Sequence, residues 1–317
     1  MQIRSNFGTN RHWPFHCAGT SFPPNFMQAM DMTRHIFLNG SYVPEDQAKI
    51  SVMDRGFLFG DAIYEVTALV DGHLIDNGLH LARFARSLAE LGIPLPMPLE
   101  NVREMQIELI RRNQMTDGTV YLQVSRGEAE RNFHPAAGLS PTFVAFTQPA
   151  KLYDTPAQRD GIAVALMSDP RWERRDIKTV MLLGQVIAKV AARTDGFSDV
   201  WLHEDGCITE GASSTAFILT KSGTIVTRQN SHAILPGCTR RAVLDLAEQR
   251  GLAIEERPFT IAEAQNAAEA FLTSASSLVI PVVKLGDSVI GDGQPGPVTR
   301  HLQEIYLAAA RACEKVI

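Results

Sequence analysis

The sequence predicts an α+β fold of two domains. Strand and helix patterns follow one another along its 317 residues without the regular strand–helix–strand alternation of a doubly wound sheet. A polar, proline-containing stretch at residues 149–157 interrupts these patterns and indicates a linker. Because 45% of the residues are hydrophobic, both parts can bury a core. We therefore expect a small domain at residues 33–148 and a larger one at residues 158–317.

The elements of the small domain follow from short local patterns. Residues 35–43 alternate apolar and polar side chains around Asn39-Gly40, which predicts a β-hairpin. Residues 61–70 are rich in β-branched side chains and predict a strand. Apolar residues at helical spacing predict an amphipathic helix over residues 80–91. The remaining elements expected here are a helix around 102–110 and strands at 119–124 and 142–147.

The larger domain shows the same mixture of patterns. Its expected strands lie at 162–167, 199–203, 215–219, around Phe271 and at 279–283. Its expected helices lie near 180–193, from about 239 and from about 298. Pro236-Gly237 is a turn signal before the second of these helices, and Thr260 with Glu263 has the spacing of a capping box.

Composition argues against several classes of function. The net charge is −5 and no stretch concentrates lysine and arginine as a nucleic-acid-binding surface would. No apolar run reaches the roughly 20 residues that a membrane-spanning helix needs. The four cysteines are scattered and form no Cys-x-x-Cys pair, which argues against a disulfide framework and a zinc ribbon. We expect reduced thiols in a cytoplasmic protein without a metal site.

The first 32 residues differ from the rest. They are polar, aromatic and proline-containing, and they lack the apolar core of a signal peptide. His12, His16 and Cys17 could be imagined as a metal site, but a disordered extension is the preferred interpretation. Met27, Met30 and Met32 are alternative translation starts, because ordered-looking sequence begins only at His35.

One nucleotide-binding pattern occurs by coincidence. Gly291, Gly293 and Gly296 satisfy G-x-G-x-x-G. A dinucleotide site needs a further strand and an acidic residue about 20 positions later, but the chain that remains resembles a single helix. We predict a glycine-rich turn, and a nicotinamide-binding oxidoreductase remains only as a rival hypothesis.

Lys178 has an unusual position among the seven lysines. It follows the charged run 173–176 and precedes the apolar run 180–183. Partial burial at such a junction favours the nucleophilic, uncharged amine. From position alone, a lysine with no function near the start of a helix remains the more common case.

Four motifs occur around this lysine and elsewhere: Arg171–Thr179 with Leu182-Leu183-Gly184, Thr209–Phe217, Arg55–Val66 and Ile234–Arg240. They resemble those of class-IV (fold type IV) aminotransferases, most closely D-amino acid aminotransferases. Their order and spacing match the family from about His35 to about Arg311, and together they are very specific. The resemblance implies a two-domain α+β fold with pyridoxal 5′-phosphate between the domains.

The resemblance also implies roles for individual residues. Lys178 would bond to the cofactor aldehyde and move the proton at the substrate Cα. Glu210 aligns with the carboxylate that pairs with the pyridine nitrogen, where an anion keeps that nitrogen protonated. The phosphate contacts would come from Arg83, the amides of Cys238 and Thr239 at a helix start, and the hydroxyls of Ser213 and Ser276.

Substrate binding shows one departure from the family pattern. Tyr64 and Arg131 match substrate-binding positions, and the family often has a histidine two residues after that arginine. Here Phe133 takes that place and His134 follows one residue later. The group of residues that binds the substrate carboxylate, the carboxylate clamp, therefore departs from the family pattern, and two alternatives stay open: His134 replaces the lost histidine, or it does not.

The predicted function is transfer of an amino group between a D-amino acid donor and a 2-oxo acid acceptor, in a homodimer. Rivals within the superfamily are an R-selective amine transaminase, a branched-chain L-amino acid aminotransferase and an aminodeoxychorismate lyase. A non-catalytic binding protein would lack the lysine or its acid partner, and both are present.

Overall fold

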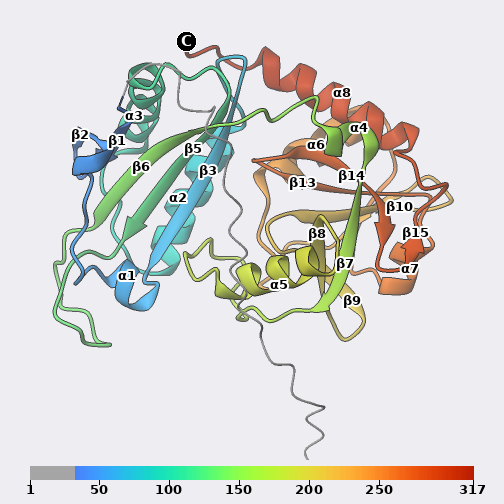
Figure 1. The fold of residues 1–317 in the computed structure, drawn as a ribbon, viewed down its shortest axis with the longest axis horizontal. Helices are drawn as coiled ribbons and strands as arrows, with labels where there is room; N and C mark the ends of the chain where they lie inside the picture. Colours follow the sequence, from blue (N-terminus) through green and yellow to red (C-terminus); the bar gives the residue numbers. More distant parts are fainter. Residues whose placement is uncertain (1–32) are drawn as a thin grey trace, which may run out of the picture. The chain divides into compact units, whose positions relative to one another are not determined.

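The first sheet is antiparallel and holds the N-terminal strands. The computed structural model describes residues 33–317, and all statements below concern that part of the chain (Figure 1). The sheet order is β2-β1-β6-β5-β3-β4. Its strands are β1 (His35–Leu38), β2 (Ser41–Pro44), β3 (Ala62–Val70), β4 (His73–Leu74), β5 (Gly118–Ser125) and β6 (Thr142–Pro149). Asn39 and Gly40 both have positive φ in the β1–β2 turn, which confirms the predicted hairpin.

Two long helices pack against this sheet. They are α2 (Asn77–Glu90) and α3 (Leu99–Arg112), and the short elements are η2 (Glu45–Gln47) and α1 (Arg55–Phe59). Phe84 of α2 and Leu109 of α3 share a core with Val120 of β5. Full burial of one such side chain stabilises the fold by about 1.5–3 kcal/mol. Both predicted helices are confirmed, although α2 begins at Asn77 rather than His80.

The second sheet is mixed, which explains the absence of a regular strand–helix rhythm. Its order is β12-β11-β10-β13-β14-β7-β8-β9, and β15 pairs with β14. The β14–β7, β7–β8 and β11–β12 pairs are parallel and the others antiparallel. The strands are β7 (Ile162–Ser168), β8 (Asp199–Glu204), β9 (Cys207–Gly211), β10 (Thr215–Leu219), β11 (Ile225–Thr227), β12 (Ile254–Glu256), β13 (Glu269–Ser274), β14 (Leu278–Leu285) and β15 (Ser288–Val289).

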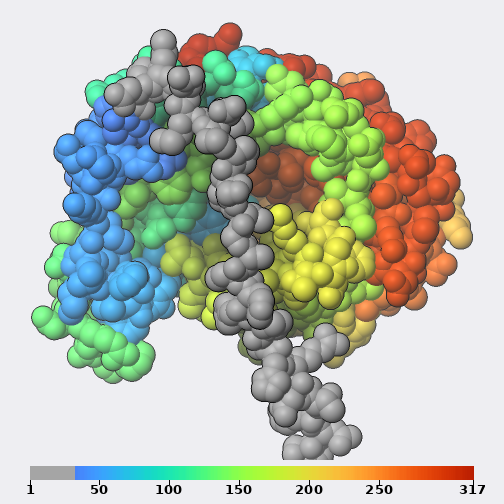
Figure 2. Space-filling view, in the orientation of Figure 1, coloured from blue at the N-terminus to red at the C-terminus, as the bar shows by residue number. Residues whose placement is uncertain are grey.

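The helices of this part are α4 (Pro156–Asp160), α5 (Leu183–Thr194), α6 (Cys238–Gln249), α7 (Ile261–Gln265) and α8 (Pro297–Ala312). The capping box of Thr260 and Glu263 is confirmed at the start of α7. Helix α5 begins at Leu183 and not near Val180, because the Val180 amide donates to the Ala62 carbonyl (3.1 Å). In Figure 2, α5 lies at the surface, in the yellow region.

The glycine-rich turn before α8 is also confirmed. Gly291 and Gly293 have positive φ, and a Cβ on Gly296 would lie 2.1 Å from the Glu269 side chain. The Glu269 carboxylate accepts hydrogen bonds from the amides of Val298 and Thr299 at the helix start. A carboxylate therefore occupies the place where a dinucleotide phosphate would bind.

Residues 34–317 form one unit that contains both sheets. The proposed domain boundaries at 148 and 158 remain a prediction, as β6 ends at Pro149 and α4 begins at Pro156. Among the described residues, no helix is long and apolar enough to cross a membrane. The expectations for residues 1–32, including His12, His16 and Cys17, lie outside the described part.

Candidate active site

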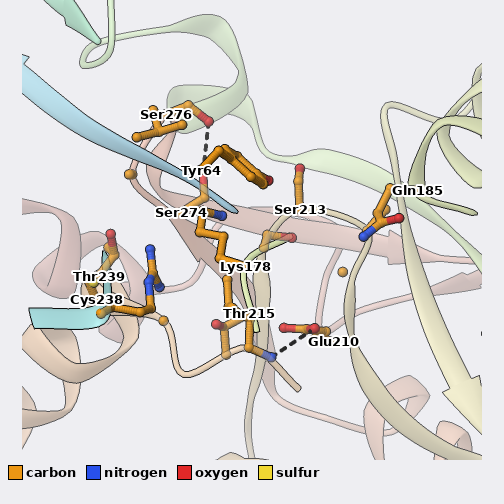
Figure 3. Close-up of a pocket in the computed structure, with 18 of the residues that line it drawn as sticks. Tyr64, Lys178, Gln185, Glu210, Ser213, Thr215, Cys238, Thr239, Ser274 and Ser276 are labelled. Atoms are coloured by element: carbon orange, nitrogen blue, oxygen red, sulfur yellow. Dashed lines mark hydrogen bonds between the residues drawn. The ribbon is translucent and has the colours of Figure 1, made fainter. Parts of the chain in front are cut away.

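A cavity of about 340 Å³ is lined by residues of both sheets (Figure 3). Eight of the ten residues predicted from the sequence line it: Tyr64, Arg83, Lys178, Glu210, Ser213, Cys238, Thr239 and Ser276. The two others, Arg131 and His134, do not. The structure thus brings together side chains that are more than two hundred positions apart in the chain, such as Tyr64 and Ser276.

Lys178 lies in an extended segment and not in a helix. Its carbonyl accepts a hydrogen bond from the Tyr64 amide (2.9 Å), and the next residue, Thr179, forms a bridge with Ile63 of β3. The lysine is half-buried, and its Nζ lies 4.2 Å from the centroid of the Tyr64 ring. Pairing with β3 therefore holds the backbone of Lys178 beside the cavity, and its amine lies over the ring of Tyr64.

Glu210, on β9, marks one end of the cavity. Its Oε1 accepts hydrogen bonds from Arg171 Nη1 (2.6 Å) and from the Leu235 amide (3.1 Å). Its Oε2 accepts none from residues 33–317. Burial raises the pKa of the Glu210 carboxyl, although Arg171 acts in the opposite direction. One oxygen is thus held by the protein, and the other is available to a ligand.

Arg171 is a site residue that the sequence analysis missed. Its guanidinium is buried and also donates to the Asp169 carboxylate (2.7 Å). Asp169 in turn accepts a hydrogen bond from the Thr209 hydroxyl (2.8 Å). The signal in the sequence was its place at the start of the motif Arg171–Thr179, but that motif does not say which of its three arginines points inward.

Arg83, on α2, marks the other end. It is buried, and its Nε and Nη2 donate to Glu65 (2.7 and 2.8 Å), while Nη1 donates to the Pro236 carbonyl (2.9 Å). His80 also contacts Glu65, at 2.9 Å. Burial disfavours the charged form of Glu65, but Arg83 and His80 outweigh it and hold the pKa of that carboxyl well below its usual range. Glu65 and His80 were both missed from the sequence.

Helix α6 begins at the same end of the cavity. Its first residue is Cys238, and its N-cap is Gly237, which has no side chain to cap the helix. The first amides of a helix have no partner within it. A Cβ on Gly237 would lie 2.9 Å from the Thr215 hydroxyl, so glycine allows this close approach. The amides of Cys238 and Thr239 are therefore arranged as predicted, at a helix start that favours an anion.

Small polar residues complete the lining. Ser213 and Ser276 are exposed to the cavity mouth, and Ser276 Oγ lies 3.3 Å from Ser274 Oγ. A Cβ on Gly211 would lie 2.1 Å from Ser214 Oγ, so a larger residue would require the Ser214 side chain to move. The atoms that come close to Gly211 therefore belong to Ser214 of the same turn.

The predicted substrate residues are divided. Tyr64 lines the cavity, whereas Arg131 and His134 are exposed in the segment between β5 and β6. The Arg131 guanidinium lies 5.5 Å from the Phe59 ring centroid and 5.8 Å from that of Phe133. Phe133 itself is 76% exposed. In this chain, the carboxylate clamp is therefore not assembled at the cavity.

These features fit pyridoxal phosphate. A carboxylate oxygen without a partner at Glu210 suits a protonated ring nitrogen, and the uncapped start of α6 beside Arg83 suits a phosphate. Figure 3 shows Lys178 between Glu210 and the Cys238–Thr239 end. The chain can therefore supply an anion partner, a phosphate cup and an amine to one ligand.

Comparison with known proteins agrees with this geometry. The family pattern described as amino-transferase class IV matches residues 62–285. A D-alanine aminotransferase of Staphylococcus haemolyticus is 38% identical over 272 residues, covering 85% of this chain and 95% of that protein. One from Bacillus licheniformis is 38% identical over 268 residues, covering 84% and 94%.

Solved structures support the fold. The branched-chain amino acid aminotransferase of Escherichia coli superposes with a TM-score of 0.83 at 23% identity, covering 89% of this chain and 96% of that one. That of Thermoproteus uzoniensis, solved with norvaline, has a TM-score of 0.80 at 23% identity, covering 89% and 96%. The family match extends over most of the chain and both ends of the cavity, so the protein belongs to the class-IV aminotransferases and is a pyridoxal-phosphate-dependent transaminase.

Proposed function

We propose that this aminotransferase moves the amino group of a D-amino acid to a 2-oxo acid. The observation that carries the proposal is the 38% identity to D-alanine aminotransferases over 85% of the chain. The branched-chain enzymes are related at 23% identity, which supports the shared fold but not their substrates. The D-amino acid reading is therefore preferred to the branched-chain one.

The roles of the residues follow from their positions. The bound cofactor supplies an electron sink for the bond electrons released at the substrate Cα. The Lys178 amine would hold the cofactor through its aldehyde and, as a free amine, would accept and return the substrate Cα proton. Glu210 keeps the ring nitrogen protonated, with Arg171 orienting the carboxylate. Arg83, Cys238 and Thr239 bind the phosphate, with the hydroxyls of Ser213 and Ser276 as further donors.

Substrate recognition is proposed to involve Tyr64, Arg131 and His134. Tyr64 lines the cavity beside Lys178. Arg131 and His134 would have to approach from outside, by movement of their loop or from a second chain. Because Phe133 cannot donate a hydrogen bond, the clamp depends mainly on Arg131. A weak clamp favours a second activity on R-amines that carry no carboxylate.

A homodimer is part of the proposal. Four apolar side chains on α5 are between 47% and 71% exposed and together form an apolar face: Leu183, Val186, Ile187 and Val190. Exposed apolar patches of this kind mark interaction sites, and a second copy of the chain is the proposed partner.

The free thiols of Cys207, Cys238 and Cys313 support a reducing, cytoplasmic location.

One donor panel tests the function. D-alanine, L-leucine and R-1-phenylethylamine are offered with the same 2-oxo acid, and the products are separated on a chiral column. We expect D-alanine to be the best donor and the R-amine to be measurable. Strong L-leucine activity with the other two inert would favour the branched-chain reading.

Light scattering at several concentrations tests the dimer, and Val186→Glu should weaken it.

A further inference from the structure

Gln185 has a side chain that the fold does not use. It lies in the first turn of α5 and lines the cavity. Its Oε1 is buried without a hydrogen-bond partner. Its Nε2 donates to no other residue within 33–317. Buried polar atoms are almost always bonded, and leaving one unmade costs free energy, so the amide points to a ligand group that completes it.

Several other polar groups in or near the cavity are already engaged, although Ser214 Oγ and Thr273 Oγ1 in its lining are also buried without a partner. Arg171 holds Glu210 and Asp169, and Ser274 contacts Ser276. Lys189, on the next turn of the same helix, pairs with Asp199. Gln185 differs from them because its carboxamide is committed to neither the fold nor a known site residue. A glutamine can also present a donor or an acceptor to the same place by turning its terminal amide.

The chemistry of the cofactor identifies the missing partner. The pyridoxal ring has four polar positions: the nitrogen, the aldehyde, the phosphate arm and a ring hydroxyl. The first three are matched by Glu210, Lys178 and the Arg83–Thr239 end. The hydroxyl lies next to the aldehyde carbon, on the edge of the ring away from the phosphate arm. Figure 3 shows Gln185 on the side of the cavity away from Cys238 and Thr239.

We propose that Gln185 is a cofactor-binding residue whose terminal amide turns so that its nitrogen takes the place of the unpartnered Oε1 and donates a hydrogen bond to the ring hydroxyl oxygen of pyridoxal phosphate. The bond would stabilise the deprotonated oxygen and hold the ring edge against α5. Gln185 lies on α5, so the contact would connect the cofactor to the helix that also has the exposed apolar face. The inference rests on the cofactor of the family and not on the proposed D-amino acid substrate.

The test uses Gln185→Leu, which keeps the size of the side chain and removes both hydrogen-bonding atoms. Gln148→Leu is the matched control, because Gln148 also lines the cavity but comes from β6. Apoenzyme is titrated with pyridoxal phosphate, and the visible absorbance of the bound cofactor is followed against pH. We expect Gln185→Leu to raise the cofactor Kd about two- to tenfold, the usual weight of one hydrogen bond, and to move the pH midpoint upward. Gln148→Leu should match the wild type.

A cofactor analogue separates this contact from a loss of fold. With 3-deoxypyridoxal phosphate, which lacks the ring hydroxyl, wild type and Gln185→Leu should bind equally well. An equal loss of affinity for both cofactors would mean that Gln185 supports the fold, and the proposal would be wrong. An unchanged Kd and spectrum with a raised KM for the donor would assign Gln185 to the substrate and equally overturn it. No amino donor enters the binding measurements, so they stand apart from the donor panel.

Discussion

The cavity and the segment between β5 and β6 contrast in how they hold charge. At the cavity, Glu210 in the lining and Glu65 behind the lining residue Arg83 are buried, and each is paired with a buried arginine. In the segment, Arg131 and His134 are exposed, and Arg131 faces the aromatic rings of Phe59 and Phe133. A buried charge is costly unless its partner is fixed, whereas an exposed charge can move freely. The cofactor end of the site is therefore preorganised within one chain, and the substrate end is not.

The largest expected effect tests the preorganised end. Lys178→Ala should fold and still bind cofactor through the phosphate cup, but turnover should fall to background because no amine remains to move the Cα proton. Borohydride reduction followed by peptide mapping measures the attachment directly. The pyridoxyl group should be found on Lys178 in the wild type and on no peptide of the variant. Its recovery on another lysine would contradict the assignment.

Glu210→Gln should have the next largest effect. The amide keeps the size of the side chain but removes the anion, so the ring nitrogen loses its proton more easily. Loss of one preorganised charge typically costs a factor of about 10²–10³ in rate. Single-turnover measurement of Cα–deuterium transfer locates the effect in the proton step. Glu204→Gln is the control, since Glu204 pairs with Arg175 and does not line the cavity.

Arg83→Ala should weaken cofactor binding more than it lowers turnover at saturating cofactor. A charge-assisted hydrogen bond contributes about 1.5–3 kcal/mol, which corresponds to roughly ten- to a hundredfold in Kd. The variant also leaves Glu65 with only His80, so its Tm should fall as well. Arg103→Ala, an exposed pair with Glu314, should change neither quantity. Unaltered cofactor affinity on titration would remove Arg83 from the phosphate cup.

Arg131→Ala tests the other side of the comparison. Arg131 is exposed, so solvent screens its charge. Removing it should lower kcat/KM for D-alanine about tenfold, less than the removal of a buried charged partner would. Activity on R-1-phenylethylamine, which has no carboxylate, should not change. His134→Ala should resemble the wild type, since His134 is exposed in a bend, where its amide donates to Asn132 Oδ1. A loss with His134→Ala equal to that of Arg131→Ala would show that His134 replaces the missing histidine.

Features that depend on a local run of residues could be predicted from the sequence, whereas contacts between distant residues and the conformation of loops could not. Strand β10 matches its predicted span, Thr215–Leu219, because its five residues are apolar or β-branched and all buried. Short strands such as β11 and β12 have too few residues to show a period. The pair of Arg171 and Glu210 joins positions far apart in the chain, and no local pattern reveals such a contact. Arg131 was found by motif, but its distance from the cavity depends on a loop whose conformation motifs do not encode.

The smallest expected effect is a pH dependence at the phosphate end. His80 is packed among Glu65 on β3, Asp76 at the start of α2 and Cys238 on α6. Burial disfavours its charged form, but the contacts with Cys238 and Glu65 outweigh this and raise the pKa of His80 to about 9.

A group with a raised pKa in the folded state contributes stability that is complete below its unfolded pKa, about 6.5 for histidine, and is lost as the pH rises through the folded value. Between pH 6.5 and about 9.5 the apoprotein should therefore lose a few degrees of Tm that His80→Gln does not lose, a change on the order of 1–2 kcal/mol. Calorimetry of both proteins across this range gives the difference, and Cys238→Ser checks that thiol titration is not its source. Parallel Tm curves for wild type and His80→Gln would show that His80 is uncharged throughout and that Arg83 alone holds Glu65.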